Sequence, residues 1–280
     1  MPAVFTNGPF RPGSFTQGGN LMRINHNISA MTTQGSLFRT SRDLGKSLEK
    51  LSTGLRINSA ADDAAGLAIS ENLRSQIIGT ATARRNALDG IAALNIAEGA
   101  GREISDILQR IRELAIQSSN DTMTSTERGY TNQEFSNLVD EIDRIASVTN
   151  YNGLKLMANT TGTDRFGKGS VGSSLWIDAN ETVGSDSITV TLGTMTTTTA
   201  GLSISSLSLM SATGASNSIS ALSSAINSVN TLRANVGAYI NRMEHTINNL
   251  TVSNTNQQSA ESMIRDVDFA TETTTFTRNQ

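Results

Sequence analysis

Two adjacent carboxylates, Asp62 and Asp63, are the first residues of this sequence whose spacing suggests chemistry. Paired carboxylates serve as general acid and base when both converge on one substrate. Adjacent residues at the start of a helix do not converge on one point, whereas an Asp at that place caps the helix by accepting bonds from its free N–H groups. We therefore interpret Asp62 or Asp63 as a helix cap. Gly54, which tolerates the left-handed backbone, ends the helix before it, and Asn58 lies in the short spacer between them.

The remaining reactive residue types are scarce. The chain has no cysteine, which excludes disulfides and thiolate sites, and its two histidines, His26 and His245, are far apart and not in His-x-x-x-His spacing. It contains no HExxH motif and no glycine-rich phosphate loop after a strand. We therefore expect no enzyme, no metal and no cofactor.

Composition excludes further classes of function. The net charge of -3 and the pI near 5.5 give no electrostatic reason for a nucleic-acid partner. No apolar run reaches the roughly 20 residues that a membrane-spanning helix needs, so membrane insertion is not expected. Aromatic residues make up only 4%, and all three prolines lie in the first dozen residues, which favours long helices with aliphatic seams.

The spacing of apolar residues along the chain predicts its helices. Residues 1–21 are rich in Gly, Pro, Asn and Gln and should be a disordered leader, with Met22 as an alternative start. Helical spacing follows over residues 24–55 and again over residues 65–118. Thr124 and Glu127 have the spacing of a capping box that begins a third helix.

A hairpin and a β-rich stretch come next. Asn152 and Gly153 between apolar flanks predict a tight hairpin turn. From residue 154 to about 214, Ser, Thr and Gly dominate and alternation indicates half-buried strands, with residues 179–186 as a loop between two of them. Helical spacing returns from Ile219 to Leu250 and resumes after a polar interruption at residues 253–259.

These patterns predict a mainly α fold: an elongated helical bundle or coiled coil formed by both chain ends, with a small β region in the middle. Each helix carries a narrow apolar seam that it cannot bury alone, so both ends must pack together. The periodicity does not decide which helices pair.

Several long stretches resemble the bacterial flagellins, and the matches span residues 22–153 and 216–280. They are residues 25–31 (NHNISAM), 51–69 (LSTGLRINSAADDAAGLAI), 109–120 (QRIRELAIQSSN), 141–153 (EIDRIASVTNYNG), 232–243 (LRANVGAYINRM) and 259–280 (SAESMIRDVDFATETTTFTRNQ).

The resemblance implies an extracellular subunit that self-assembles as a homo-oligomer into the flagellar filament for motility. After the leader (1–21), it divides the chain into a terminal coiled-coil helix with its spoke (22–64), rod-domain helices (65–153), a variable β-rich middle (154–215) and a C-terminal rod helix (216–280). Gly54, Asn58, Asp62 and Asp63 fall in the spoke.

The resemblance also implies partners. Flagellins leave the cell unfolded through the flagellar export apparatus with its chaperone, and they meet cap and junction proteins. Hosts detect some of them with Toll-like receptor 5 through an Arg, a Leu one turn later and a Glu on the next helix. Those positions match Arg110, Leu114 and Glu134, and the alternative is that these residues serve only subunit contacts.

Two departures from the family pattern stand out. The leader before Met22 has no counterpart, and flagellins continue beyond the equivalent of Gln280 with an amphipathic helix. We therefore expect a truncated form whose first helix lacks its partner and which polymerises poorly alone. The alternative function is a hook–filament junction protein, which shares the two-ended coiled-coil plan.

Overall fold

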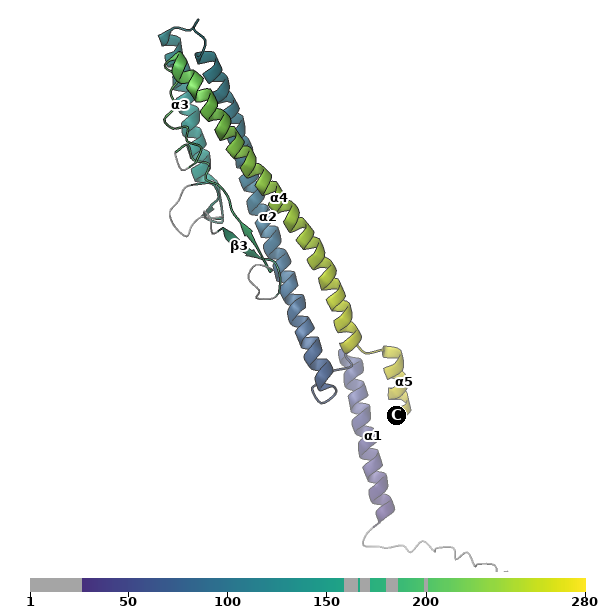
Figure 1. Ribbon diagram of the computed structural model, residues 1–280. Helices are drawn as coiled ribbons and strands as arrows, with labels where there is room; N and C mark the ends of the chain where they lie inside the picture. The colour runs from purple at the N-terminus through teal and green to yellow at the C-terminus, as the bar shows by residue number, and fades with distance from the viewer. Residues whose placement is uncertain (1–26, 159–165, 167–171, 180–185, 199–200) are drawn as a thin grey trace, which may run out of the picture. The chain divides into compact units, whose positions relative to one another are not determined.

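The structure is a computed structural model that describes residues 27–158, 166, 172–179, 186–198 and 201–280 (Figure 1). The predicted disordered leader and most of the predicted loop at residues 179–186 lie outside the described residues. The described chain forms two compact units, one of residues 59–265 and one of residues 27–58 with 266–280.

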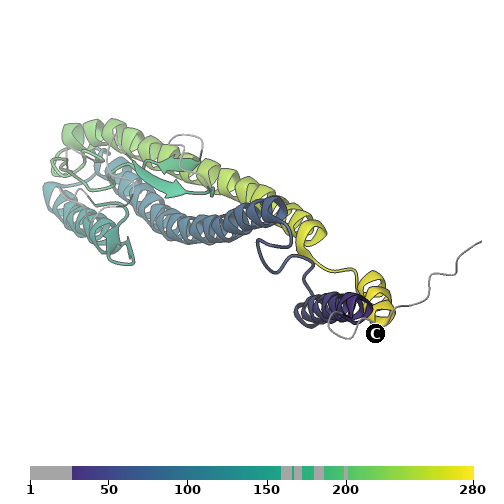
Figure 2. The same ribbon diagram turned by 90° about the horizontal axis from the view of Figure 1, so that it is seen from below.

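The larger unit is built on two long helices, α2 (Ala64–Ser118) and α4 (Ala212–Arg265). They lie side by side along their lengths in both ribbon views (Figures 1 and 2). Residue pairs that touch across them run in opposite order, Glu71 with Arg265 and Glu98 with Arg233, so the helices are antiparallel. No proline interrupts either helix, and their apolar residues recur at helical spacing.

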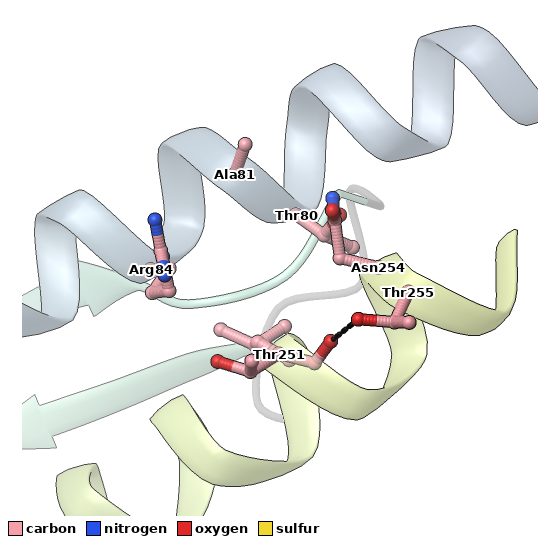
Figure 3. A pocket seen from close by; sticks show the side chains of 7 residues that line it. Thr80, Ala81, Arg84, Thr251, Asn254 and Thr255 are labelled. Carbon is pink, nitrogen blue, oxygen red and sulfur yellow. Dashed lines mark hydrogen bonds between the residues drawn. The ribbon is translucent and has the colours of Figure 1, made fainter. Parts of the chain in front are cut away.

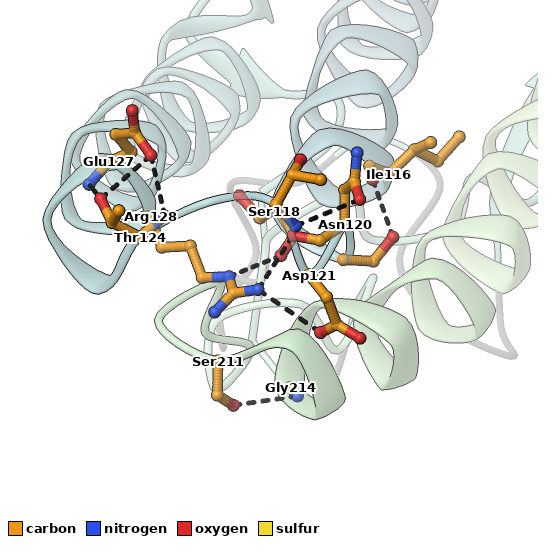
Figure 4. A network of polar contacts seen from close by, with 11 residues as sticks. Ile116, Ser118, Asn120, Asp121, Thr124, Glu127, Arg128, Ser211 and Gly214 are labelled. Carbon is orange, nitrogen blue, oxygen red and sulfur yellow. Dashed lines mark hydrogen bonds and ion pairs between the residues drawn. The ribbon is translucent and has the colours of Figure 1, made fainter.

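Helix α3 (Ser125–Val148) turns back along α2. Its start carries the predicted capping box, because the Thr124 side chain accepts from the Glu127 N–H and Glu127 accepts from the Thr124 N–H. Arg128 closes the turn between the helices: its Nε donates to the Ser118 carbonyl at 2.9 Å and its Nη2 to the Asn120 carbonyl at 2.9 Å (Figure 4). The guanidinium thereby gives a partner to the Ser118 carbonyl, one of the carbonyls that the end of α2 leaves without a bond inside the helix.

Two small antiparallel hairpins complete this unit. The strands β1 (Asn150–Tyr151) and β2 (Leu154–Lys155) flank the predicted Asn-Gly turn, which is confirmed. The strands β3 (Ser173–Trp176) and β4 (Ser187–Val190) form the second hairpin, which packs against α2. Gly90 makes room for it, since a Cβ there would lie 2.6 Å from Leu175 Cδ1.

The core of the larger unit fills only part of the helix pair. Buried apolar side chains gather around α2, α3, the hairpins and α4; the helical members include Leu94, Ala97, Ile104, Leu108, Ile111, Phe135, Ile142, Leu222, Val229 and Val236. The sequence-based expectation of a mainly helical protein, with its two halves paired and small β hairpins in between, is confirmed.

The smaller unit contains α1 (Ile28–Thr53) and α5 (Phe269–Asn279), which pack together. The C-terminal helical pattern is not one helix, because α4 ends at Arg265 and Asp268 caps a new helix by accepting from the Ala270 N–H at 2.9 Å. The break coincides with contacts to residues after α1: the Val267 N–H donates to the Gly54 carbonyl, and Leu55 bridges to Asp266. Part of α1 therefore has a helical partner within this chain.

Candidate functional site

The segment after α1 contains the residues first singled out in the sequence. Gly54 adopts a φ of 73° and its N–H donates to the Lys50 carbonyl at 2.9 Å, so it ends α1 in the left-handed conformation. Asn58 donates its side-chain amide to the Leu55 carbonyl at 3.2 Å. Ile57 between them is buried, which fixes the segment although it belongs to no helix or strand.

The two aspartates have separate roles. Asp63 caps α2, because its Oδ1 accepts from the Gly66 N–H at 2.9 Å. Asp62 instead accepts from the N–H and the hydroxyl of Ser59 at 3.0 and 3.1 Å, which holds the short turn before the cap. Both carboxylates are therefore used to shape the backbone, and they do not converge on a common point.

Arg110 and Glu134, the charged members of the predicted receptor patch, form an ion pair between α2 and α3. The Nε and Nη2 atoms of Arg110 donate to Glu134 Oε1 at 3.0 and 2.9 Å, and its Nη1 donates to Glu113 at 3.1 Å. The hydrogen bond to Glu134, followed by that to Glu113, raises the pKa of the Arg110 guanidinium. All three side chains remain largely exposed, which leaves the patch accessible to a partner.

Leu114, the third member, is placed differently. It follows Arg110 by one turn but is only 2% exposed, as part of the core shared with α3. In this structure it supports the patch from below, and a partner that touches Arg110 and Glu134 would not reach its side chain.

A polar seam joins the other part of the helix pair. The Asn254 amide donates to the Ile77 carbonyl and to the Thr80 hydroxyl, each at 2.9 Å, and Gln257 donates to Gln76 at 3.2 Å. A cavity of about 200 Å³ lies beside these bonds, lined by Thr80, Ala81, Arg84, Leu250, Thr251, Asn254 and Thr255 (Figure 3).

Sequence reasoning missed this seam as a contact. The polar run at residues 253–259, which interrupts the apolar spacing, was the signal that could have revealed it. The cavity holds neutral side chains and one exposed arginine, so it offers a structural contact and no reactive group.

Helix α1 presents the largest apolar exposure of the smaller unit. Its five exposed large side chains are between 58% and 69% accessible: Ile28, Met31, Leu37, Phe38 and Leu48. The Arg42 guanidinium lies 5.3 Å from the centre of the Phe38 ring. These residues belong to the helical stripe that sequence reasoning marked as a packing seam.

Two kinds of site are missing from the part of the chain that the structure describes. No group of three or more His, Cys, Asp or Glu side chains is placed there to hold a metal ion. None of the helices in that part is both long enough and apolar enough to cross a membrane.

Comparisons with known proteins account for nearly the whole chain. Family models for the bacterial flagellin N-terminal and C-terminal helical regions match residues 24–161 and 219–280. The chain is 42% identical over 267 residues to a flagellar filament 33 kDa core protein of Treponema phagedenis, with 92% of this chain and 91% of that protein covered. It is 40% identical to a flagellin of Bacillus subtilis, with the same shares covered.

A solved structure agrees with these matches. The crystal structure of a Bacillus cereus flagellin is 30% identical, with a TM-score of 0.51, and the match covers 63% of this chain and 94% of that one. The same family is indicated by the structure, with helical regions at both ends and small β hairpins between them, and by these relatives. The chain belongs to the bacterial flagellin family.

Proposed function

We propose that the exposed apolar side chains of α1 are a surface through which this subunit packs against other copies. As a flagellin, the chain is a structural protein of the flagellar filament and serves motility outside the cell; it is not an enzyme. The matches are to flagellins, which sets aside the alternative of a hook–filament junction protein.

The observation that carries the proposal is the exposure of α1. Five large apolar side chains on one helix remain more than half exposed, although α5 packs on the same helix. Large apolar side chains exposed together on one helix mark interaction surfaces, and a helix gains most of its stability when such a surface is covered. In a homo-oligomer the covering surface is supplied by another copy.

The test replaces two of these side chains and measures self-association. The double variant Phe38→Ser with Leu48→Ser should remain monomeric at concentrations where the unchanged chain associates in sedimentation velocity. Gln34→Ala with Ser41→Ala, two exposed polar positions of the same helix, is the matched control and should associate like the unchanged chain. Equal association of the unchanged chain and the apolar-to-serine variant would refute the proposal.

A second proposal concerns recognition by Toll-like receptor 5. We propose that the exposed Arg110–Glu134 pair, with Glu113 beside it, forms the recognised surface and that Leu114 acts by holding α2 against α3. Support comes from the exposure and pairing of the charged groups and from the burial of Leu114.

A receptor reporter assay tests this assignment. Arg110→Ala and Glu134→Ala should each lower the potency of the protein. Arg144→Ala breaks another exposed ion pair of α3, that with Glu141, and should leave potency unchanged. If Arg110→Ala signals as strongly as Arg144→Ala, the patch is not the recognised surface.

The remaining partners follow from family membership alone. We propose that the subunit passes through the flagellar export apparatus with its chaperone and meets the cap and junction proteins at the filament. We also propose that residues 54–63 act as the spoke between a coiled-coil part and a rod part. The backbone bond of Gly54 and the side-chain bonds of Asn58, Asp62 and Asp63 support this role, since they define the course of that segment.

A further inference from the structure

We propose that Asn152 is a deamidation site that the β1–β2 hairpin keeps unreactive while the chain is folded. The turn between these strands takes no part in the sites described above. The protection of Asn152 is independent of filament assembly, because it depends only on the chemistry and geometry of residues 149–157.

The reaction requires nothing beyond water. The backbone nitrogen of Gly153 attacks the side-chain carbonyl carbon Cγ of Asn152, the new C–N bond closes a succinimide ring, and the side-chain nitrogen leaves as ammonia. Water then opens the ring at either carbonyl and yields isoaspartate or aspartate. Glycine is the most permissive residue to follow the asparagine, because it has no Cβ to hinder the attack.

Both reacting groups are accessible to solvent. Asn152 and Gly153 are exposed, and a Cβ placed on Gly153 would meet no atom within 4 Å. Within the described residues the Asn152 side chain makes no hydrogen bond. Neither burial nor a hydrogen bond of that side chain therefore protects the site.

The backbone conformation does protect it. Asn152 has a φ of 49° and Gly153 a φ of 81°, which together define a type I′ turn. In such a turn ψ of the first residue is about +30°, and with L chirality this places the Asn152 Cβ and the Gly153 nitrogen roughly 150° apart about the Cα–C bond. Ring closure needs these two atoms close to eclipsed, so the nucleophile lies on the wrong side.

The hairpin holds this conformation from both strands. Tyr151 pairs with Leu154 and Asn150 with Lys155. Beyond the pairs, the Leu156 N–H donates to the Thr149 carbonyl at 3.1 Å, and the side chains of Leu156 and Met157 are fully buried. The turn reaches the reactive geometry only when these pairs open, so the rate of deamidation reports local opening.

The product no longer fits the turn. Isoaspartate inserts one extra methylene group into the main chain and adds a negative charge. A two-residue loop sets the register of its hairpin, so an isoaspartyl chain cannot restore the pairing of Tyr151 with Leu154. A chain that ages while unfolded is therefore marked at Asn152, and a chain that stays folded is not.

The test compares the purified full chain in mildly alkaline buffer with and without urea, followed by peptide mapping with mass spectrometry and isoaspartate detection. Isoaspartate at Asn152 should form at least about tenfold faster in urea, equivalent to about 1.4 kcal/mol or more of opening free energy. Asn217 and Asn227, each followed by serine within α4, are measured in the same digests as references. Equal rates at Asn152 in both arms, or no isoaspartate in urea, would overturn the proposal.

Two variants test the protective role of the hairpin in buffer without urea. Leu156→Ala removes a fully buried side chain next to β2 and should raise the rate at Asn152 in buffer toward the rate in urea. Val148→Ala changes an exposed side chain before β1 and should leave the rate as it is. A Leu156→Ala protein whose rate in buffer equals that of Val148→Ala would contradict the role of the hairpin.

Discussion

The two halves of the α2–α4 pair are held together by different chemistry. Between residues 87–115 of α2 and 215–243 of α4 the contact is mainly an aliphatic core, accompanied by the partly exposed Glu98–Arg233 ion pair. Between the first turns of α2 and the last turns of α4 the contact is largely polar: Asn254 with Thr80, Gln257 with Gln76 and Arg265 with Glu71. The buried residues of that half include the polar Ser70 and Thr80, and only a few aliphatic residues such as Ala83 and Leu250.

The difference separates stability from register. Apolar burial contributes roughly 25 cal/mol per Å² and tolerates sliding between similar side chains, so the aliphatic half supplies most of the free energy. A hydrogen bond contributes only about 1 kcal/mol net but costs more when it is left unmade, so the polar half penalises every misaligned pairing. One half holds the helices together and the other fixes how they align.

The largest expected effect comes from a truncation in the aliphatic half. Leu108→Ala removes a fully buried side chain and should lower the free energy of unfolding by about 2–5 kcal/mol. Leu73→Ala makes the same change in the polar half, where the side chain is half-buried, and should cost clearly less. Denaturant unfolding followed by circular dichroism measures both, and equal losses would erase the distinction between the halves.

In the polar half, the next variant removes a hydrogen-bonding side chain of the polar seam. Asn254→Ala removes the bonds to the Ile77 carbonyl and the Thr80 hydroxyl and should cost about 1 kcal/mol, since the buried Thr80 hydroxyl loses a partner. Asn256→Ala, two residues later and exposed, is the control and should change the free energy of unfolding only slightly. If both variants unfold at the same urea concentration as the unchanged chain, the seam adds no stability.

Two glycines of α2 provide a test in which replacement by alanine should change the stability in opposite directions. A Cβ placed on Gly99 would meet no atom within 4 Å, so Gly99→Ala should stabilise the helix by about 0.5–1 kcal/mol. A Cβ at Gly79 would lie 2.5 Å from the Ala179 Cβ and 3.1 Å from its Cα, so Gly79→Ala should destabilise by displacing the loop after β3. Thermal melts of the two variants should move in opposite directions.

The smallest expected effect is a pH dependence. The hydrogen bond from Arg233, with a further one from Arg102, lowers the pKa of Glu98 below its ordinary 4.5. A carboxylate with a lowered pKa stabilises the fold above its unfolded pKa, and this contribution is lost as the pH falls through the folded value. Glu98→Gln should therefore be less stable than the unchanged chain at neutral pH, and the gap should close below pH 4.5.

Chemical unfolding at a series of pH values checks this. A gap between Glu98→Gln and the unchanged chain that stays constant down to acidic pH would mean that the charge of Glu98 does not contribute.

Sequence patterns predicted helices and turns well where the interactions that determine them join residues close in sequence. Helical spacing located α2 and α3, the Thr124–Glu127 pair marked the start of α3, and Asn152–Gly153 marked the hairpin. The break between α4 and α5 was not predictable in the same way. The stretch has no helix-breaking residue, and the contacts that accompany the break join Leu55 to Asp266 and Gly54 to Val267, more than two hundred positions apart.

The candidate site shows the same limit at the scale of one helical turn. Residues four apart share a face but are offset by about 40° around the helix axis. That offset is enough to leave Arg110 in solvent and bury Leu114 under α3. Spacing predicted that the two residues are neighbours, and only the packing of α3 determines which of them a partner can touch.

The polar seam also bears on the order in which the chain folds. Its contacts join residues 174 to 194 positions apart, whereas Arg128 reaches Ser118 across only 10. The entropy lost on closing a loop rises with its length, and distant contacts form late in folding. The α2–α3 turn is thus placed to form early, and the seam that fixes the alignment of α2 with α4 closes only after the intervening chain has folded.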